Sequence, residues 1–266
     1  MKLPILEFDS EDGVINKNSY LRHVANSPED YGNISLIEKY NIDTCLLVFS
    51  KEDLPFLQDL EICYKYRFGS NTNNVYSYKN KFLIAIAALG GPAAAGVMEE
   101  LGILGIRKFI ACGSAGLIDH EIDSSAFMLV ERAIRDEGTS FKYEKPAIYS
   151  YPDKDLTEAL ATFLHKHNFK FLRTTTWTTD AFFRETPTRI KNRKKQGATV
   201  VDMECSTWCS VAKFYGYKFV QLLYTSDITK QGEWAFKSVE ERNNLKLQII
   251  ELMIDFVDEY IGENKI

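Results

Sequence analysis

Two acidic residues, Glu204 and Asp227, are the side chains best suited to do chemistry in this 266-residue sequence, although 22 residues separate them. The apolar run 199–201 predicts the end of a strand just before Glu204. A helical repeat of apolar residues closed by Gly216 predicts a helix just after it. A second apolar run, 218–224, predicts the strand that delivers Asp227. Strand, helix and strand usually form a parallel crossover, so both strand ends should emerge at one edge of a sheet. We therefore expect the two carboxyl groups, which can accept hydrogen bonds or exchange protons, to meet over one pocket.

Alternating strands and helices along the rest of the chain supply the frame for this pocket. The order favours an α/β fold. Without an internal repeat or a linker we expect a single domain over residues 1–266, with 1–40 as an atypical lead-in. The expected strands are Cys45–Phe49, Ile62–Phe68, Val75–Tyr78, Phe82–Ala88, Lys108–Cys112, 126–134 and Phe171–Thr176. The expected helices are Ile34–Tyr40, Ala93–Leu101, Asp155–His167 and Val239–Ile261, with a charged helix face at Arg189–Lys195. Loops are expected at 69–74, 178–183 and 231–234, and the last could form a flap.

A loop of small residues, Cys112–Gly116, is expected after the strand 108–112. Small side chains let the backbone approach a ligand closely, and the Ser114 hydroxyl together with free N–H groups suits an anion. A tight turn would explain the same residues. Neither this run nor the turn 90–92 matches the glycine fingerprint of dinucleotide-binding folds, so dinucleotide binding is disfavoured.

Composition and charge narrow the classes of protein to which the chain can belong. Apolar residues make up 45% of the sequence, enough to bury a large core, and the net charge of −5 argues against a nucleic-acid partner. The five cysteines form no CxxC pair and no metal-ligand spacing, which indicates buried free thiols and no metal site. The first 13 residues are too short and too acidic for a signal peptide, and no apolar run reaches the ~18 residues of a membrane helix. We expect a soluble, cytoplasmic protein without a membrane partner.

Six stretches between Phe82 and Asp227 resemble, in the same order, the nucleoside phosphorylases of the purine nucleoside and uridine phosphorylase type. They are AALGGPAAAG, IACGSAGLI, AIRDEGTSFKY, TTDAFFRET, VVDMECSTW and LLYTSDI. The resemblance implies an α/β domain around a mixed, barrel-like sheet flanked by helices. It also implies cleavage of the bond between ribose and a nucleobase, with inorganic phosphate as co-substrate and no cofactor. Such proteins form homo-oligomers, either dimers or hexamers built from dimers.

The resemblance also assigns roles to five residues. Glu204 matches the carboxylate that binds the ribose 2′- and 3′-hydroxyls, and Met203 matches the thioether under the sugar. Hydroxyl contacts that tighten as the sugar becomes oxocarbenium-like lower the barrier to cleavage. Phe182 matches the aromatic residue that stacks on the base. Asp227, preceded by Ser226 in the base site, matches the acid that protonates or hydrogen-bonds N7 of a leaving purine. A dry pocket would help it keep its proton near neutral pH, and the expected substrate is a purine nucleoside.

The resemblance is weakest in the expected phosphate site. Ser114 and Gly113 are retained there. The family's Gly-Asp-Pro turn with its arginine is replaced by 49–55, which holds neither a glycine nor an arginine. A second family arginine corresponds to Ala111. Arg67 can be matched, across a gap, to the arginine that a neighbouring subunit lends to the phosphate.

Phosphate carries nearly two negative charges at pH 7, and the planar fork of arginine normally binds it. Phosphate binding should therefore be weak here unless Lys51 or Arg135 moves into the site.

Three hypotheses about function remain open. The first is a purine nucleoside phosphorylase with a rebuilt phosphate site, which the prevalence of phosphorylases in the family narrowly favours. The second is a nucleosidase in which water replaces phosphate; relatives that hydrolyse methylthioadenosine activate the water with a glutamate near the N-terminus, and Glu7 is the nearest candidate. The third is a non-catalytic nucleoside-binding or storage member, which the retained Glu204 and Asp227 argue against.

Overall fold

The computed structural model describes residues 4–11, 13–25, 34–49, 54–68, 71–230 and 233–263. Its helices are α1 (Lys17–Ala25), α3 (Ser35–Tyr40), α4 (Gly91–Ile103), α5 (Lys154–Lys166), α6 (Pro187–Lys195), α7 (Cys205–Tyr215) and α8 (Val239–Glu263). Its strands are β1 (Thr44–Val48), β2 (Glu61–Phe68), β3 (Asn71–Tyr78), β4 (Phe82–Ile86), β5 (Lys108–Leu117), β6 (Phe127–Asp136), β7 (Tyr149–Ser150), β8 (Phe171–Thr179), β9 (Ala198–Asp202), β10 (Lys218–Lys230) and β11 (Glu233–Phe236). Short 3-10 turns lie at Pro4–Leu6, Pro55–Asp59, Ser140–Lys142 and Phe182–Arg184.

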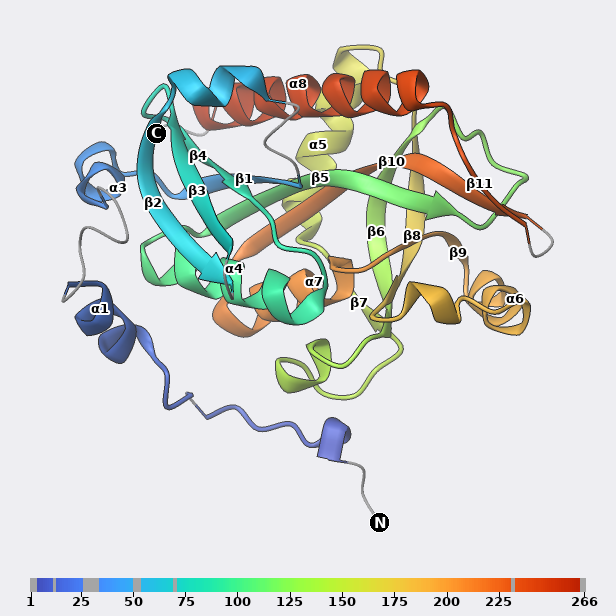
Figure 1. Cartoon of the computed structure of the whole chain (residues 1–266), viewed down its shortest axis with the longest axis horizontal. Helices are drawn as coiled ribbons and strands as arrows, with labels where there is room; N and C mark the ends of the chain where they lie inside the picture. The colour runs from blue at the N-terminus through green and yellow to red at the C-terminus, as the bar shows by residue number, and fades with distance from the viewer. Residues whose placement is uncertain are drawn as a thin grey trace.

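The strands of the described chain join one mixed sheet, and part of that sheet closes into a ring. β5 pairs in parallel with β10 and antiparallel with β9. β10 pairs antiparallel with β6, and β6 leads through β8 back to β9 in parallel pairs. From β5 the sheet also extends outward through β1, β4, β3 and β2 (Figure 1). This partly closed sheet with helices around it confirms the expected barrel-like α/β architecture.

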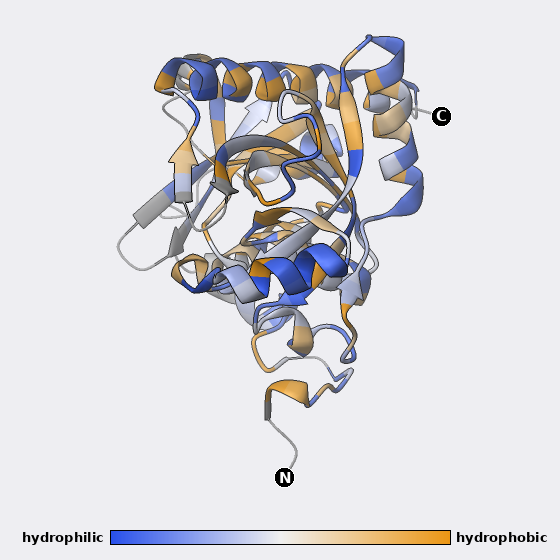
Figure 2. Cartoon of the chain, turned by 90° about the vertical axis from the view of Figure 1, so that its right-hand side faces the viewer, coloured by the Kyte–Doolittle hydropathy of each residue, from blue (hydrophilic) through white to orange (hydrophobic). Residues whose placement is uncertain are grey.

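Helices cover both faces of the sheet. In Figure 1, α8 runs above the sheet, and α4 and α7 lie side by side below it. Two large clusters of buried apolar residues fill the core. One includes Phe109 of β5 and Trp208 of α7, and the other includes Leu222 of β10 and Met253 of α8. Figure 2 shows hydrophobic strands inside and the strongly hydrophilic helix α6 outside. Because α6 has no buried residue, the expected solvated helix is confirmed.

The segment that carries Glu204 has the expected strand and helix. β9 ends at Asp202, and α7 begins at Cys205 with most of its residues buried. Gly216 ends α7 with a left-handed φ of 71°, a conformation that costs glycine little because it has no Cβ. The order strand, helix and glycine stop is therefore confirmed.

The relation between β9 and β10 differs from the expected parallel crossover. β9 runs antiparallel to β5 and pairs Val201 with Gly116, whereas β10 runs parallel to β5 and pairs Asp227 with the same Gly116. The two strands therefore point in opposite directions. They still bring Glu204 and Asp227 to one place, because both flank the end of β5. The spacing of apolar residues predicts where a strand lies but not which strand it pairs with, so it could not reveal that β5 lies between β9 and β10.

β5 extends through the small-residue run 112–116, so the loop expected there is wrong. The run pairs residue by residue with β10. The glycines serve packing: a Cβ on Gly113 would lie 2.7 Å from the Phe49 ring, and one on Gly116 would lie 2.9 Å from Val201 Cγ1. Small residues that admit a neighbouring side chain look the same in a sequence as small residues that admit a ligand.

Other local expectations are also wrong. Residues 71–74 belong to β3, and β8 continues through Thr179. Trp234 lies in β11, which pairs antiparallel with β10, whereas residues 231–232 of the expected flap lie outside the described residues. The lead-in contains α1, whose Tyr20 hydroxyl lies 2.5 Å from the Tyr64 hydroxyl of β2. Side-chain pairs so distant in sequence leave no local signal.

All five cysteines are buried free thiols, which confirms that expectation. Within the described ranges, the helices lack the combination of length and apolar character that a membrane span requires.

Candidate active site

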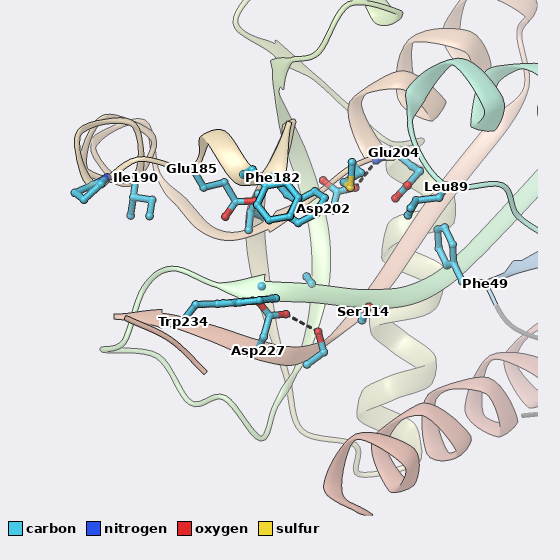
Figure 3. Close-up of a pocket in the computed structure, with 17 residues that line it drawn as sticks. Phe49, Leu89, Ser114, Phe182, Glu185, Ile190, Asp202, Glu204, Asp227 and Trp234 are labelled. Carbon is cyan, nitrogen blue, oxygen red and sulfur yellow. Dashed lines mark hydrogen bonds between the residues drawn. The ribbon is translucent and has the colours of Figure 1, made fainter. Parts of the chain in front are cut away.

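A pocket of about 560 Å³ lies where β5, β9 and β10 meet the segment that follows β8. Figure 3 shows two facing walls: one carries Phe182, Glu185, Asp202 and Glu204, and the other carries Ser114, Asp227 and Trp234. Of the residues singled out in the sequence, those that line this pocket are Ser114, Phe182, Met203, Glu204, Ser226 and Asp227. Side chains that are far apart in the chain thus meet in one cavity.

Asp202 builds the turn from β9 into α7. Its Oδ1 accepts hydrogen bonds from the hydroxyls of Thr176 and Thr178, and its Oδ2 accepts from the backbone N–H groups of Glu204 and Cys205. The second pair satisfies N–H groups at the start of α7, as a helix cap does. Burial raises the pKa of Asp202, and these donors oppose the rise. A carboxyl group with four donors fixes the turn and with it the direction of Glu204.

Glu204 is 4% exposed and lines the pocket directly after this turn. Its Oε1 accepts a hydrogen bond from the Gly90 N–H at 2.6 Å. Gly90 has a φ of 88°, so the turn that brings this N–H to Glu204 favours glycine. Burial raises the pKa of Glu204 to about 8; the negative charge of Asp202 adds to the rise, and the Gly90 donor opposes it. The carboxyl group retains lone pairs for further donors, such as sugar hydroxyls.

A β-bulge in β10 aims Asp227 into the pocket. The register with β5 shifts between Thr225 and Asp227, which leaves Ser226 as the extra residue. Both carboxyl oxygens of Asp227 hold a donor: the Ser226 hydroxyl lies 2.6 Å from Oδ1, and the Trp234 indole N–H lies 2.8 Å from Oδ2. Gly116 leaves room for the carboxyl group, since a Cβ there would lie 3.1 Å from Oδ2. Donors on both oxygens fix the orientation of the Asp227 carboxyl group in the pocket.

Glu185 is a further carboxyl group of the pocket, and it is not among the residues that the sequence predicted for the site. It lines the cavity on the wall that faces Asp227 (Figure 3). Burial raises its pKa to about 7, and the negative charge of Asp227 adds to the rise. A signal was present, because Glu185 lies three residues after Phe182 in the stretch TTDAFFRET that the family resemblance had already selected.

Exposed aromatic rings line the pocket on both walls. Phe182 is 46% exposed and Trp234 is 58% exposed, and Figure 3 shows them on opposite walls. The Phe183 ring supports Phe182 at a centroid distance of 4.0 Å. Exposed rings at the mouth of a mostly apolar pocket are suited to a flat, aromatic ligand.

The residues expected to bind phosphate are only partly brought together. Ser114 is the exposed residue of β5 and lines the pocket. Gly113 does not line it, because the Phe49 ring packs against the site of its missing Cβ. Lys51 and the side chain of Arg67 lie outside the described residues.

Two further candidates, Arg135 for phosphate and Glu7 for the activation of water, are absent from the described pocket lining. Arg135 is buried, and its guanidinium donates to the Ser140 hydroxyl and to the carbonyl oxygens of Glu144 and Lys145. It therefore holds the 140–145 segment in place and does not supply the pocket with a cation in place of the missing arginines. Glu7, the candidate to activate water, is exposed and is absent from the described pocket lining.

The titratable side chains of the described pocket lining are all acidic. The described residues that line it include four carboxyl groups, those of Glu185, Asp202, Glu204 and Asp227, but no lysine, arginine or histidine. Within the part of the chain that the structure describes, no group of three or more His, Cys, Asp or Glu side chains could hold a metal ion. Carboxyl groups accept hydrogen bonds from hydroxyl and N–H groups and repel anions, so the lining suits an uncharged polar ligand.

Comparison with known proteins identifies relatives of this arrangement. The chain is 24% identical over 135 residues to a guanosine phosphorylase of Halorubrum lacusprofundi, covering 51% of this chain and 56% of that protein. It is 26% identical over 148 residues to a uridine phosphorylase of Thermococcus kodakarensis, covering 51% and 53%. A DeoD-type purine nucleoside phosphorylase of Chromobacterium violaceum is 25% identical over 193 residues, covering 70% and 81%. The chain thus spans about half the length of the first two relatives.

A solved structure and a family pattern agree with these relatives. The AMP nucleosidase from Bacteroides thetaiotaomicron VPI-5482 shares the fold with a TM-score of 0.68 at 21% identity, over 84% of this chain and 90% of that one. The pattern of the Phosphorylase superfamily matches residues 43–258, which include every element that lines the pocket. The chain therefore belongs to the phosphorylase superfamily, as the resemblance of its six stretches predicted.

Proposed function

We propose that this protein cleaves the N-glycosidic bond of a purine nucleoside and transfers the ribose to phosphate. The observation that carries the proposal is the position of Glu204 and Asp227 on facing walls of one pocket. A nucleoside has hydroxyl donors on its sugar and nitrogen atoms on the edge of its base. Carboxyl groups on two sides of one cavity can therefore contact both halves of the molecule at once.

In this proposal the sugar lies at Glu204 and over Met203. The ribose hydroxyls donate to the Glu204 carboxylate, and these contacts tighten as positive charge develops on the sugar. Interactions that strengthen in the transition state raise turnover rather than affinity alone. Replacing Glu204 by alanine should lower the turnover rate by about 10²-fold or more.

The base lies between the Phe182 and Trp234 rings, beside Asp227. A purine anion is a poor leaving group, so a proton or a hydrogen bond at N7 speeds its departure. Ser226 and Trp234 hold the Asp227 carboxyl group at this place. A carboxyl group there favours a purine, because a pyrimidine has no N7.

Phosphate as the acceptor is supported by the names of the relatives, which are guanosine, uridine and purine nucleoside phosphorylases. The Ser114 hydroxyl in the pocket is a suitable donor to it.

Hydrolysis is the second candidate, and one observation favours it: the described lining is acidic and holds no cation. At an effective dielectric constant of 20, each pair of like charges 4 Å apart repels by about 4 kcal/mol. Water meets no such repulsion.

The test is to measure release of free base from inosine, guanosine and adenosine, with and without phosphate, beside the Glu204→Ala variant as a control for contaminating enzymes. Base release that requires phosphate and yields ribose 1-phosphate supports phosphorolysis. An equal rate without phosphate supports hydrolysis. No base release from any nucleoside under either condition contradicts an enzymatic function, and nucleoside binding by calorimetry would then favour a binding protein.

A further inference from the structure

Glu185 and Asp227 face each other across the pocket but differ in what holds them. Both oxygens of Asp227 accept a hydrogen bond, from the Ser226 hydroxyl and the Trp234 indole N–H. Glu185 makes no side-chain hydrogen bond or ion pair with any other described residue. Donors on a carboxyl group stabilise its ionised form, whereas a partly buried carboxyl group without donors keeps its proton more readily.

Among the described residues that line the pocket, every titratable side chain beside Glu185 is acidic. The titratable side chains that line the pocket with it are Asp202 of β9, Glu204 at the start of α7 and Asp227 of β10. Arg184, next to it in the chain, and Arg189 of α6 are not lining residues. Burial and the charge of Asp227 raise the pKa of Glu185 to about 7. Two carboxyl groups whose surroundings differ in this way can divide acid and base roles between them.

We propose that Glu185 is the proton donor to the leaving base and that Asp227 is its ionised partner. The proposal rests on the proposed nucleoside cleavage and changes one role in it, because the group that matches the family's acid already carries donors on both oxygens. Asp227 then keeps the proton on Glu185 through its negative charge and can accept a hydrogen bond from N7–H once the proton has moved to the base.

Proton transfer from Glu185 accompanies the cleavage of a purine nucleoside. The bond between C1′ and N9 breaks, and its electron pair stays with the base. The Glu185 O–H proton moves to N7, so the base leaves uncharged and Glu185 becomes a carboxylate. An oxygen of phosphate, or of water, forms the new bond to C1′ and releases its own proton to solvent. A solvent proton then restores Glu185.

Two substrates separate proton donation from binding. Inosine needs a proton on its leaving base, whereas the base of 7-methylinosine already carries a positive charge and leaves uncharged without one. Glu185→Gln should lower inosine turnover by about 10²-fold or more and 7-methylinosine turnover by far less. Retained cleavage of 7-methylinosine also shows that the variant is folded. Glu251→Gln, which makes the same change on the exposed face of α8, should alter neither rate.

The pH profile distinguishes Glu185 from Asp227. Wild-type turnover of inosine should fall as the pH rises above about 7, where Glu185 loses its proton. Glu185→Gln should abolish this decline. Asp227→Asn should keep it but displace it to lower pH, because the negative charge that holds the proton is gone.

The proposal is overturned if Glu185→Gln retains both the inosine rate and the decline, or if Asp227→Asn abolishes the decline. If wild-type protein cleaves inosine and 7-methylinosine and Glu185→Gln matches it, the role of Glu185 fails while the proposed function stands. If wild-type protein cleaves neither, both fail.

Discussion

Replacing Glu204 by glutamine should stabilise the protein at alkaline pH and leave its stability nearly unchanged at acid pH. Glu204 is buried, and its pKa lies near 8 rather than near its ordinary value of 4.5. Because the pKa is raised on folding, the folded state binds a proton that the unfolded state has lost. The stability that this proton confers is complete below about pH 4.5 and is lost as the pH rises through about 8.

The magnitude follows from the rise in pKa. Each unit corresponds to about 1.4 kcal/mol, so the rise amounts to several kcal/mol, which local relaxation and water reduce. We expect Glu204→Gln to raise the free energy of unfolding by about 2–3 kcal/mol at pH 9, and by less than about 0.5 kcal/mol at pH 4.5. Glutamine is neutral at both pH values and still offers an oxygen to the Gly90 N–H.

Thermal unfolding at pH 4.5, 7 and 9 measures the effect. A gain of 1 kcal/mol should raise the midpoint of a protein of this size by roughly 2–4 °C. The exposed control Glu251→Gln should show no such pH dependence. If Glu204→Gln is no more stable than wild type at pH 9, or is stabilised equally at pH 4.5, Glu204 does not carry a buried charge in the folded protein.

Three shorter predictions concern the same pocket. Gly116→Ala should lower turnover about tenfold and cost roughly 1–3 kcal/mol of stability, because its Cβ would crowd both Val201 and Asp227; an unchanged rate would remove Gly116 from the support of Asp227. Phe182→Ala should weaken nucleoside binding by roughly 1–2 kcal/mol, about 5- to 30-fold in calorimetry, and should shift the unfolding midpoint little because the ring is half exposed; unaltered binding would argue against stacking. Nucleoside affinity should weaken as the pH falls below about 8, by up to tenfold per pH unit, because Glu204 must lose its proton before it can bind the sugar hydroxyls as a carboxylate. An affinity that does not change with pH would mean that Glu204 does not bind the sugar as a carboxylate.

Local patterns in the sequence predicted the elements around Glu204 well. The helix that follows it, the glycine stop at Gly216 and the buried strands before and after all depend on residues near one another in the chain. Apolar spacing and the left-handed conformation of glycine act over a few residues, so a single sequence shows them.

Features that depend on distant residues were predicted less well. The small residues of the run 112–116 predict a loop, but the run is part of β5. Its glycines make room for Phe49, Val201 and Asp227, which come from three other segments. The opposite directions of β9 and β10 follow from their separate pairing with β5. Which strand lies between two others is a property of the whole sheet, and no local spacing reports it.

The structure brings the residues proposed to contact sugar and base together in one pocket, whereas it brings those proposed to bind phosphate together only in part. Six of the residues that were singled out through the family resemblance line one pocket. Glu185 could not be singled out from its local sequence, because an acidic residue in a charged stretch is usually solvated. Its raised pKa depends on burial and on the charge of Asp227, which lies far away in the chain. For the anion, the described lining offers Ser114 and no cation.

The most direct test of the account is a crystal structure of the protein with a bound purine nucleoside. We predict density for the ribose hydroxyls within hydrogen-bond distance of the Glu204 carboxyl group, with the base between Phe182 and Trp234 and its N7 edge toward Asp227 and Glu185. A nucleoside bound elsewhere, or bound in this pocket with its sugar away from Glu204, would contradict it.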